Sequence, residues 1–462
     1  MPVLDDIEHL LRRTEFVARP ARVAQLTPLS LEAAVDDILA VPANPGTAAL
    51  TETQNWRRGE QLTHFWLDRM AHDSPRPIQE KMAFFWHGHF CSEFGKVGSA
   101  DLMQEQIDGF RFGALSNLRT LATNMSTQVA MLRYLDNNRN RDTSPNQNFA
   151  RELMELFLLG VGNYLEADVE AATAAWTGHT DDWQTDEYVW RDDWHDGSAK
   201  QFLGRTINTD NSSQAARRLH GAETIDVMLG SGVVPNTVPN VPNRGRDARE
   251  VAAEFLSKKL WIEFAGTQPS APVLAALRDA ALAADFAITP WLRALLLRDE
   301  FYSAEVKQGL VRSPVEFTVA LMVATGRRSA EATPLWLMQG MGQRPLFPPN
   351  VSGWKHNAYW VNASAMAKRT ETVRSFVWRS MRGYWGDEDP YLHLAGGSIN
   401  REVVQDRDST GRAVLDQLLV LMGLSLTPTS YDALAAFADA AQRWERIDLA
   451  HLILFSPELQ VA

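Results

Sequence analysis

The sequence is poor in cysteine and in positive charge. Cys91 is the only cysteine among 462 residues, which excludes a disulfide framework and a cluster of thiolate metal ligands. The formal net charge of −12 argues against a general nucleic-acid-binding protein, because such proteins gain most of their affinity by neutralising phosphates. No apolar stretch reaches the length that a membrane span requires.

Several recognisable signals are also missing. The acidic first residues, 1–7, contain neither the basic segment nor the apolar segment of a signal peptide. We therefore expect a cytoplasmic protein, or a periplasmic or exported one if the chain is trimmed. The sequence shows no internal repeat, no glycine-rich phosphate loop and no Gly-x-Ser-x-Gly nucleophile motif.

Most of the sequence shows the periodicity of α-helices. Apolar residues recur at three- and four-residue spacing in most segments, which predicts an all-α fold, built as one large multi-helix domain. The segment 180–206 is rich in Trp and Asp and has no such period, so we expect a small irregular or β-hairpin insertion there. Within it, 187–191 and 200–204 are the candidate strands.

A segment rich in proline and asparagine divides the chain. Residues 230–245 hold three prolines and three asparagines, which is typical of a loop or linker. The sequence thus predicts an N-terminal helical part, 1–229, that carries the polar motifs. It also predicts a C-terminal helical part, 246–462, packed on the first.

The most informative stretch is a helix predicted over 145–159. A hydroxyl group and a proline begin it, and two glycines end it. Its many apolar residues predict burial, yet Arg151, Glu152 and Glu155 lie in its middle, and the two carboxylates share one face. Two interpretations are open. The first is an exposed stripe in which Arg151 neutralises a neighbour, and the second is a metal or acid–base site between helices.

Histidines mark two more segments. His87 and His89 lie in a nearly all-apolar helix, and residues two apart point about 200° from each other on a regular helix. They cannot both face one metal ion unless the helix breaks at Gly88, and a single buried histidine is more often a hydrogen-bonded core residue. His195 and Asp196 suit a metal site or a hydrogen-bonded dyad, but Asp-Gly is also common in plain turns.

Taken together and in order, these motifs resemble a large bacterial family called domain of unknown function 1800. The matching segments span 9 to about 369 and are 9–14, 85–90, 148–157, 176–178, 195–204, 259–261, 307–317, 341–343 and 348–354. The resemblance implies a mostly helical fold and no particular activity. It also implies export of many members and a partner, encoded nearby, that resembles sulfatases and phosphatases. The missing export signal departs from that pattern.

Two classes of function follow. In the first, the protein is a metal-assisted hydrolase or related enzyme, although no His-Glu-x-x-His or Glu-x-x-His spacing is present. A divalent metal ion is then the candidate cofactor, because imidazole and carboxylate groups bind Zn, Mn, Fe or Mg. We expect the polar motifs to share one cleft, since an unpaired charge beside apolar residues is costly. The predicted catalytic groups are Glu152, Glu155, Arg151 and Asn148, and the predicted metal ligands are His87, His89, His195 and Asp196.

The second class is a non-catalytic binding or scaffold protein in cell-envelope or polysaccharide assembly. It would act with the sulfatase- or phosphatase-like partner, without nucleic acid and without a membrane span. Trp176, Trp194 and Trp354 are the candidate substrate-binding residues, because an indole ring stacks on a sugar or on a partner's surface.

Overall fold

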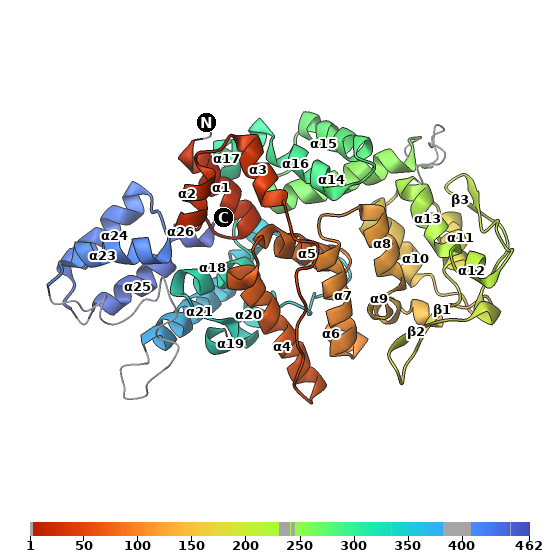
Figure 1. The fold of residues 1–462 in the computed structure, drawn as a ribbon, viewed down its shortest axis with the longest axis horizontal. Helices are drawn as coiled ribbons and strands as arrows, with labels where there is room; N and C mark the ends of the chain where they lie inside the picture. Colours follow the sequence, from red (N-terminus) through yellow and green to blue (C-terminus); the bar gives the residue numbers. More distant parts are fainter. Residues whose placement is uncertain are drawn as a thin grey trace.

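The computed structural model of the chain describes residues 3–230, 241, 245–307, 309–333, 335–381, 408–443 and 445–462. Within these ranges the protein is mainly α-helical, with two small antiparallel sheets of two strands each. The predicted all-α class is therefore confirmed. Figure 1 shows an elongated molecule with helix α5 (Pro77–His89) near its middle. No helix in the described ranges has the length and apolar character needed to cross a membrane.

The first helices of the chain surround α5. They are α1 (Leu4–Glu15), α2 (Pro20–Leu26), α3 (Leu31–Leu39), α4 (Asn55–Asp68) with its π-helical extension η1 (Arg69–Asp73), α6 (Phe94–Val97) and α7 (Ala100–Phe112). Pro77 begins α5, where its missing N–H is no loss, and every residue of α5 except Gly88 is buried. A helix that is apolar on nearly all sides belongs in the core, and α5 packs against α1, α7 and η1.

The segments after α7 form one end of the molecule, on the right in Figure 1. They are α8 (Leu118–Thr127), α9 (Val129–Tyr134), η2 (Asn137–Arg139), α10 (Asn148–Glu152), η3 (Leu153–Leu158), α11 (Glu166–Ala175), strands β1 (His179–Asp182) and β2 (Glu187–Trp190), η4 (Asp192–Trp194), strands β3 (Lys200–Phe202) and β4 (Arg205–Ile207), α12 (Gln214–Arg217) and α13 (His220–Leu229).

The remaining helices lie on both sides of α5 in Figure 1, with α14 to α16 above it, α18 to α21 below it and to its left, and α23, α24 and α25 at the opposite end of the molecule. They are α14 (Ala248–Ala265), α15 (Ala271–Ala283), α16 (Ile288–Leu296), η5 (Asp299–Tyr302), α17 (Ala304–Lys307), α18 (Pro314–Thr325), α19 (Ser329–Ala332), α20 (Leu335–Gly340), η6 (Asn357–Trp360), α21 (Ala363–Met381), α23 (Gly411–Met422), α24 (Pro428–Ala440), α25 (Arg446–Leu454) and α26 (Pro457–Gln460).

The helix predicted over 145–159 differs from the prediction in its start and in its winding. It begins at Asn148, and its second half, η3, is a π-helix in which Leu159 N–H donates to the Met154 carbonyl five residues back (2.8 Å). The predicted regular helix was therefore wrong in this half. Its predicted end is confirmed, because Gly160 takes a φ of +89°.

The insertion is made of strands, but the predicted pairing was wrong. Strand β2 pairs with β1 and strand β3 pairs with β4, so 187–191 and 200–204 do not pair with each other. The reason is local: Leu203 and Gly204 both take positive φ and close a two-residue turn of the kind that joins adjacent strands.

The predicted linker at 230–245 falls mostly outside the described residues, so the division into two parts stays a prediction. Buried apolar side chains from both parts, from Ile7 to Leu459, belong to one continuous cluster. Helix α1 also contacts α14 directly. The first and last thirds of the chain thus share a core around α5.

Candidate functional site

A cavity of about 310 Å³ lies beside α5. It is bounded by α14, by the start of α18 and by the loop that runs from 343 into η6. Aromatic rings form its apolar walls, namely Phe84, Phe85, Trp354 and Trp360. Its inner polar groups are His89, Lys259, Glu263, Glu316 and Gln343, and its exposed rim carries Lys355 and His356. Segments far apart in the chain thus converge on one pocket of ligand size.

The loop after Gln343 is seated directly on α5. Trp354 stacks on Phe84 with 5.3 Å between ring centroids and meets the edge of His87 at 5.4 Å. The N–H of Leu346 donates to Nε2 of His87 (3.1 Å). Burial lowers the pKa of His87 to about 3, so the ring is neutral and serves as an acceptor. His87 is therefore placed as a core residue that fixes this loop.

Lys259 and His89 form the central polar contact of the cavity. Lys259 Nζ lies 3.1 Å from His89 Nδ1 and 2.9 Å from the Leu156 carbonyl oxygen. His89 Nε2 lies 2.9 Å from the Phe157 carbonyl oxygen, which accepts only, so Nε2 carries the hydrogen and Nδ1 accepts from Lys259. Both carbonyls belong to the last turn of η3, where helix carbonyls lack partners within the helix.

Burial lowers the pKa of both Lys259 and His89. Lys259 has no carboxylate within ion-pair distance among the described residues, and burial lowers its pKa to about 8. The pKa of His89 is held well below its ordinary value, first by burial and then by the nearby Lys259. A helix C-terminus favours a cation, yet desolvation outweighs that effect here. Lys259 is thus an amine with a substantial uncharged fraction near neutral pH.

A buried ion cluster borders the cavity on the other side. Lys81 forms an ion pair with Glu316 and lies 3.4 Å from Glu263. Glu316 also caps its own helix, because its Oε2 accepts from the Ser313 N–H (2.8 Å). The nearby ammonium and these hydrogen bonds outweigh burial and lower the pKa of Glu316 to about 2. The Glu316 carboxylate is therefore charged and already partnered.

The predicted catalytic groups of the 148–155 segment lie outside the cavity wall. Arg151 forms an ion pair with Glu166 (2.6 Å), and Glu155 accepts a hydrogen bond from the Tyr164 hydroxyl. Asn148 Nδ2 donates to the Leu135 carbonyl (3.2 Å). Glu152 is half-buried, and burial together with Glu155 raises its pKa. Each of the four groups thus interacts with neighbours outside the cavity, and none of them lines it.

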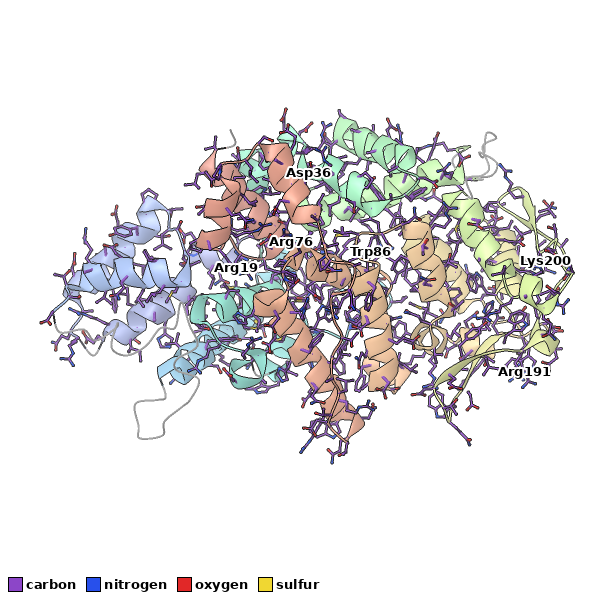
Figure 2. All side chains as sticks on the ribbon, in the orientation of Figure 1. Arg19, Asp36, Arg76, Trp86, Arg191 and Lys200 are labelled. Atoms are coloured by element: carbon purple, nitrogen blue, oxygen red, sulfur yellow. The ribbon has the colours of Figure 1, made fainter. Side chains whose placement is uncertain are left out.

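The predicted pair His195 and Asp196, which lies at the hairpins, is also absent from the cavity wall. His195 Nε2 lies 2.9 Å from Nδ1 of His220, and Asp196 forms an ion pair with Lys200 (2.7 Å). Figure 2 shows Lys200 at one end of the molecule and Trp86 of α5 near its middle. The expectation of one shared cleft was wrong for this pair, and of the predicted metal ligands only His89 lines the cavity.

The three tryptophans have three different environments. Trp176 is buried and donates from Nε1 to Thr224 (3.0 Å), and Trp194 lies under the Arg141 guanidinium, 3.5 Å from the ring centroid. Trp354 alone lies on the cavity wall. Among the described residues, no three His, Cys, Asp or Glu side chains are placed to share a metal ion.

The cavity is formed by the segments that carry the family resemblance, 85–90, 259–261, 307–317, 341–343 and 348–354. The sequence matches the family described as "Protein of unknown function (DUF1800)" over residues 9–461. The chain belongs to the DUF1800 family. The match extends beyond the segments noted in the sequence, into the C-terminal helices. No curated protein and no solved structure matches the chain.

Four inner polar residues of this DUF1800 cavity were not predicted as site residues: Lys259, Glu263, Glu316 and Gln343. A signal was present for two of them, because Lys259 and Glu263 are four residues apart and so share one face of α14. Lys81, which pairs with Glu316 beside the cavity, lies in the aromatic segment of α5, where a buried charge requires a partner.

Proposed function

We propose that the cavity beside α5 is an active site for a small organic molecule, with the amine of Lys259 as its reactive group. The observation that carries the proposal is the position of Nζ: it lies at a cavity wall, with no described carboxylate within ion-pair distance and with two neutral acceptors. Buried lysines of this kind serve enzymes as general bases and nucleophiles.

The hydrogen bonds of Nζ fit the uncharged amine. A neutral amine has two hydrogens, and His89 Nδ1 and the Leu156 carbonyl accept both of them. The lone pair then occupies the remaining position on Nζ. Nζ also lies 4.8 Å from the centroid of the Phe255 ring, a contact that favours the ammonium form. Burial outweighs this contact and lowers the pKa of Lys259 to about 8, so the uncharged amine is accessible.

The surroundings support chemistry on a small molecule. The volume of about 310 Å³ is at the lower end of the range for ligand sites. Its aromatic walls offer a bound molecule apolar surface beside the amine. The metal-assisted hydrolase predicted from the sequence gains no support from the arrangement of the described His, Asp and Glu residues, so the proposal is built on Lys259 instead.

Competitive labelling tests the proposal. Trace acetic anhydride is applied to the folded protein from pH 6 to pH 10, and acetylation is quantified by peptide mass spectrometry. Lys258, exposed on the same helix, is the internal reference. We expect acetylation of Lys259 to follow a titration with its midpoint near pH 8, and compounds that raise the melting temperature should protect Lys259 alone. An unreactive Lys259, or one that follows Lys258 at every pH, would refute the proposal.

A further inference from the structure

We infer that the substrate of this site is an aldehyde or ketone with an apolar ring or chain, and that Lys259 Nζ forms a Schiff base with its carbonyl carbon. The inference rests on the proposed function above and adds the class of substrate and the covalent step. Three features of the cavity lead to it: the orientation of the amine, the polarity of the open contacts and the shape of the apolar walls.

The amine is oriented for attack. With both hydrogens held by His89 Nδ1 and the Leu156 carbonyl, rotation about the terminal bond of Lys259 is restricted, and the lone pair keeps one direction. A nucleophile held in one orientation loses less entropy on reaction. His89 acts here as a positioning residue, because its own ring is fixed by the Phe157 carbonyl.

The carboxylates of the wall already lie beside Lys81, whereas one amide donor is open. Lys81 lies 3.4 Å from Glu263 and forms an ion pair with Glu316, which also accepts from the Ser313 N–H. The Asn357 side chain is fully used by backbone groups. The Gln343 carboxamide oxygen accepts from Val315 N–H (3.0 Å), which leaves its NH₂ group without a partner among the described residues. A ligand that satisfies this wall must bring an acceptor, as a carbonyl oxygen does.

The apolar walls suit a flat or compact hydrocarbon body. Phe84 and Trp354 are stacked 5.3 Å apart with an interplanar angle of 23°, and Phe85 is stacked on His89 beside the amine. Rings of this kind gain most from contact with another apolar face. The cavity therefore offers an apolar region next to the amine and an amide donor on its polar wall.

The step balances without an oxidant, a reductant or a metal. The Nζ lone pair forms the N–C bond, and the π electrons of the carbonyl move to its oxygen. One proton passes from nitrogen to that oxygen, which gives a neutral carbinolamine and restores a lone pair on nitrogen. This lone pair forms C=N as the C–O bond breaks, and the second hydrogen of Nζ leaves with the hydroxide as one molecule of water.

Reductive trapping tests the inference. The full-length protein is incubated at pH 7 with benzaldehyde and sodium cyanoborohydride, and N-benzyl adducts are mapped by peptide mass spectrometry. We expect the adduct on Lys259 to form at least tenfold faster than on Lys258, because a pKa near 8 leaves roughly a tenth of the amine uncharged at pH 7, whereas a lysine with the ordinary pKa of about 10.4 is uncharged to well under a thousandth. Lys258→Met should leave the adduct unchanged, and His89→Gln should slow it while the pH midpoint shifts.

Equal rates on Lys259 and on exposed lysines would overturn the inference. The wild-type protein alone gives this answer, so the test does not depend on whether a Lys259→Met variant folds. Acetylation of the same preparation separates the two proposals. If Lys259 is acetylated with a midpoint near pH 8 but is never benzylated, the Schiff base is wrong and the active site stands. If neither reaction selects Lys259, both proposals fail.

Discussion

A Cβ atom on Gly353 would lie 2.1 Å from the carbonyl oxygen of Gly88. Gly353 also takes a φ of +76°, a conformation that a side chain disfavours. The loop that carries Trp354 therefore meets α5 backbone against backbone, and the cavity depends on this close approach.

Gly353→Ala should destabilise the protein by about 3 kcal/mol or more, because left-handed strain and steric overlap add together. Gly46→Ala is the matched control: its φ is also +76°, but no atom lies within 4 Å of the added Cβ. We expect the control to lose about 1 kcal/mol. Urea denaturation measures both, and equal losses would contradict the close contact at Gly88.

The stability of the wild type relative to Lys259→Met should rise between pH 8 and pH 10.5. Folding lowers the pKa of Lys259 from 10.5 to about 8, so in this window the unfolded chain binds more protons than the folded one. The gain should be on the order of 2 kcal/mol. Urea midpoints at pH 7, 8, 9 and 10 measure it, with Lys258→Met as the control. A difference that does not vary with pH would contradict burial of the amine.

Lys81→Met should destabilise the protein by about 3–5 kcal/mol, since it leaves the Glu316 carboxylate buried without its main partner. The double variant Lys81→Met with Glu316→Gln should recover part of this loss, because the amide is neutral and still accepts from the Ser313 N–H. Chemical denaturation of the wild type, the two single variants and the double variant completes the cycle. Additive losses would show that the two side chains do not interact.

Glu155→Gln should lower the pKa of Tyr164 from about 12 toward its ordinary value of 10. Burial, the hydrogen bond to Glu155 and its negative charge together raise that pKa, and the substitution removes the charge. Alkaline absorbance titration measures the change, with Tyr164→Phe identifying the signal. Glu152→Gln, three residues earlier, should leave the titration of Tyr164 in place. A similar shift in both variants would mean that Glu155 is not the specific partner.

Local rules predicted the helices well because their signals are carried by neighbouring residues. The Ser313-Pro314 start of α18, with Glu316 completing a capping box, is one example. The same rules failed at the hairpins. There the sequence contained the strands, but the choice of partner depended on a two-residue turn at Leu203 and Gly204.

The site itself was only partly predictable. His89, Trp354 and the aromatic character of α5 were visible as unusual residues. Lys259 was not, because it follows another lysine, and which of the two is buried depends on how α14 rotates against η3 and α5. Helix α14 carries apolar residues around much of its circumference, so periodicity could not decide between Lys258 and Lys259.

Because η3 is wound as a π-helix, the number of residues in this segment determines where its last carbonyls lie. A π-helical turn holds one residue more than an α-helical turn over the same rise. Removing one residue from Leu153–Leu158 would close the wide turn into α-helical winding and so rebuild the backbone around Leu156 and Phe157. The carbonyls of these two residues would then lose the placement in which they meet Lys259 and His89. Relatives that keep every motif but lose one residue here should therefore lack this amine site.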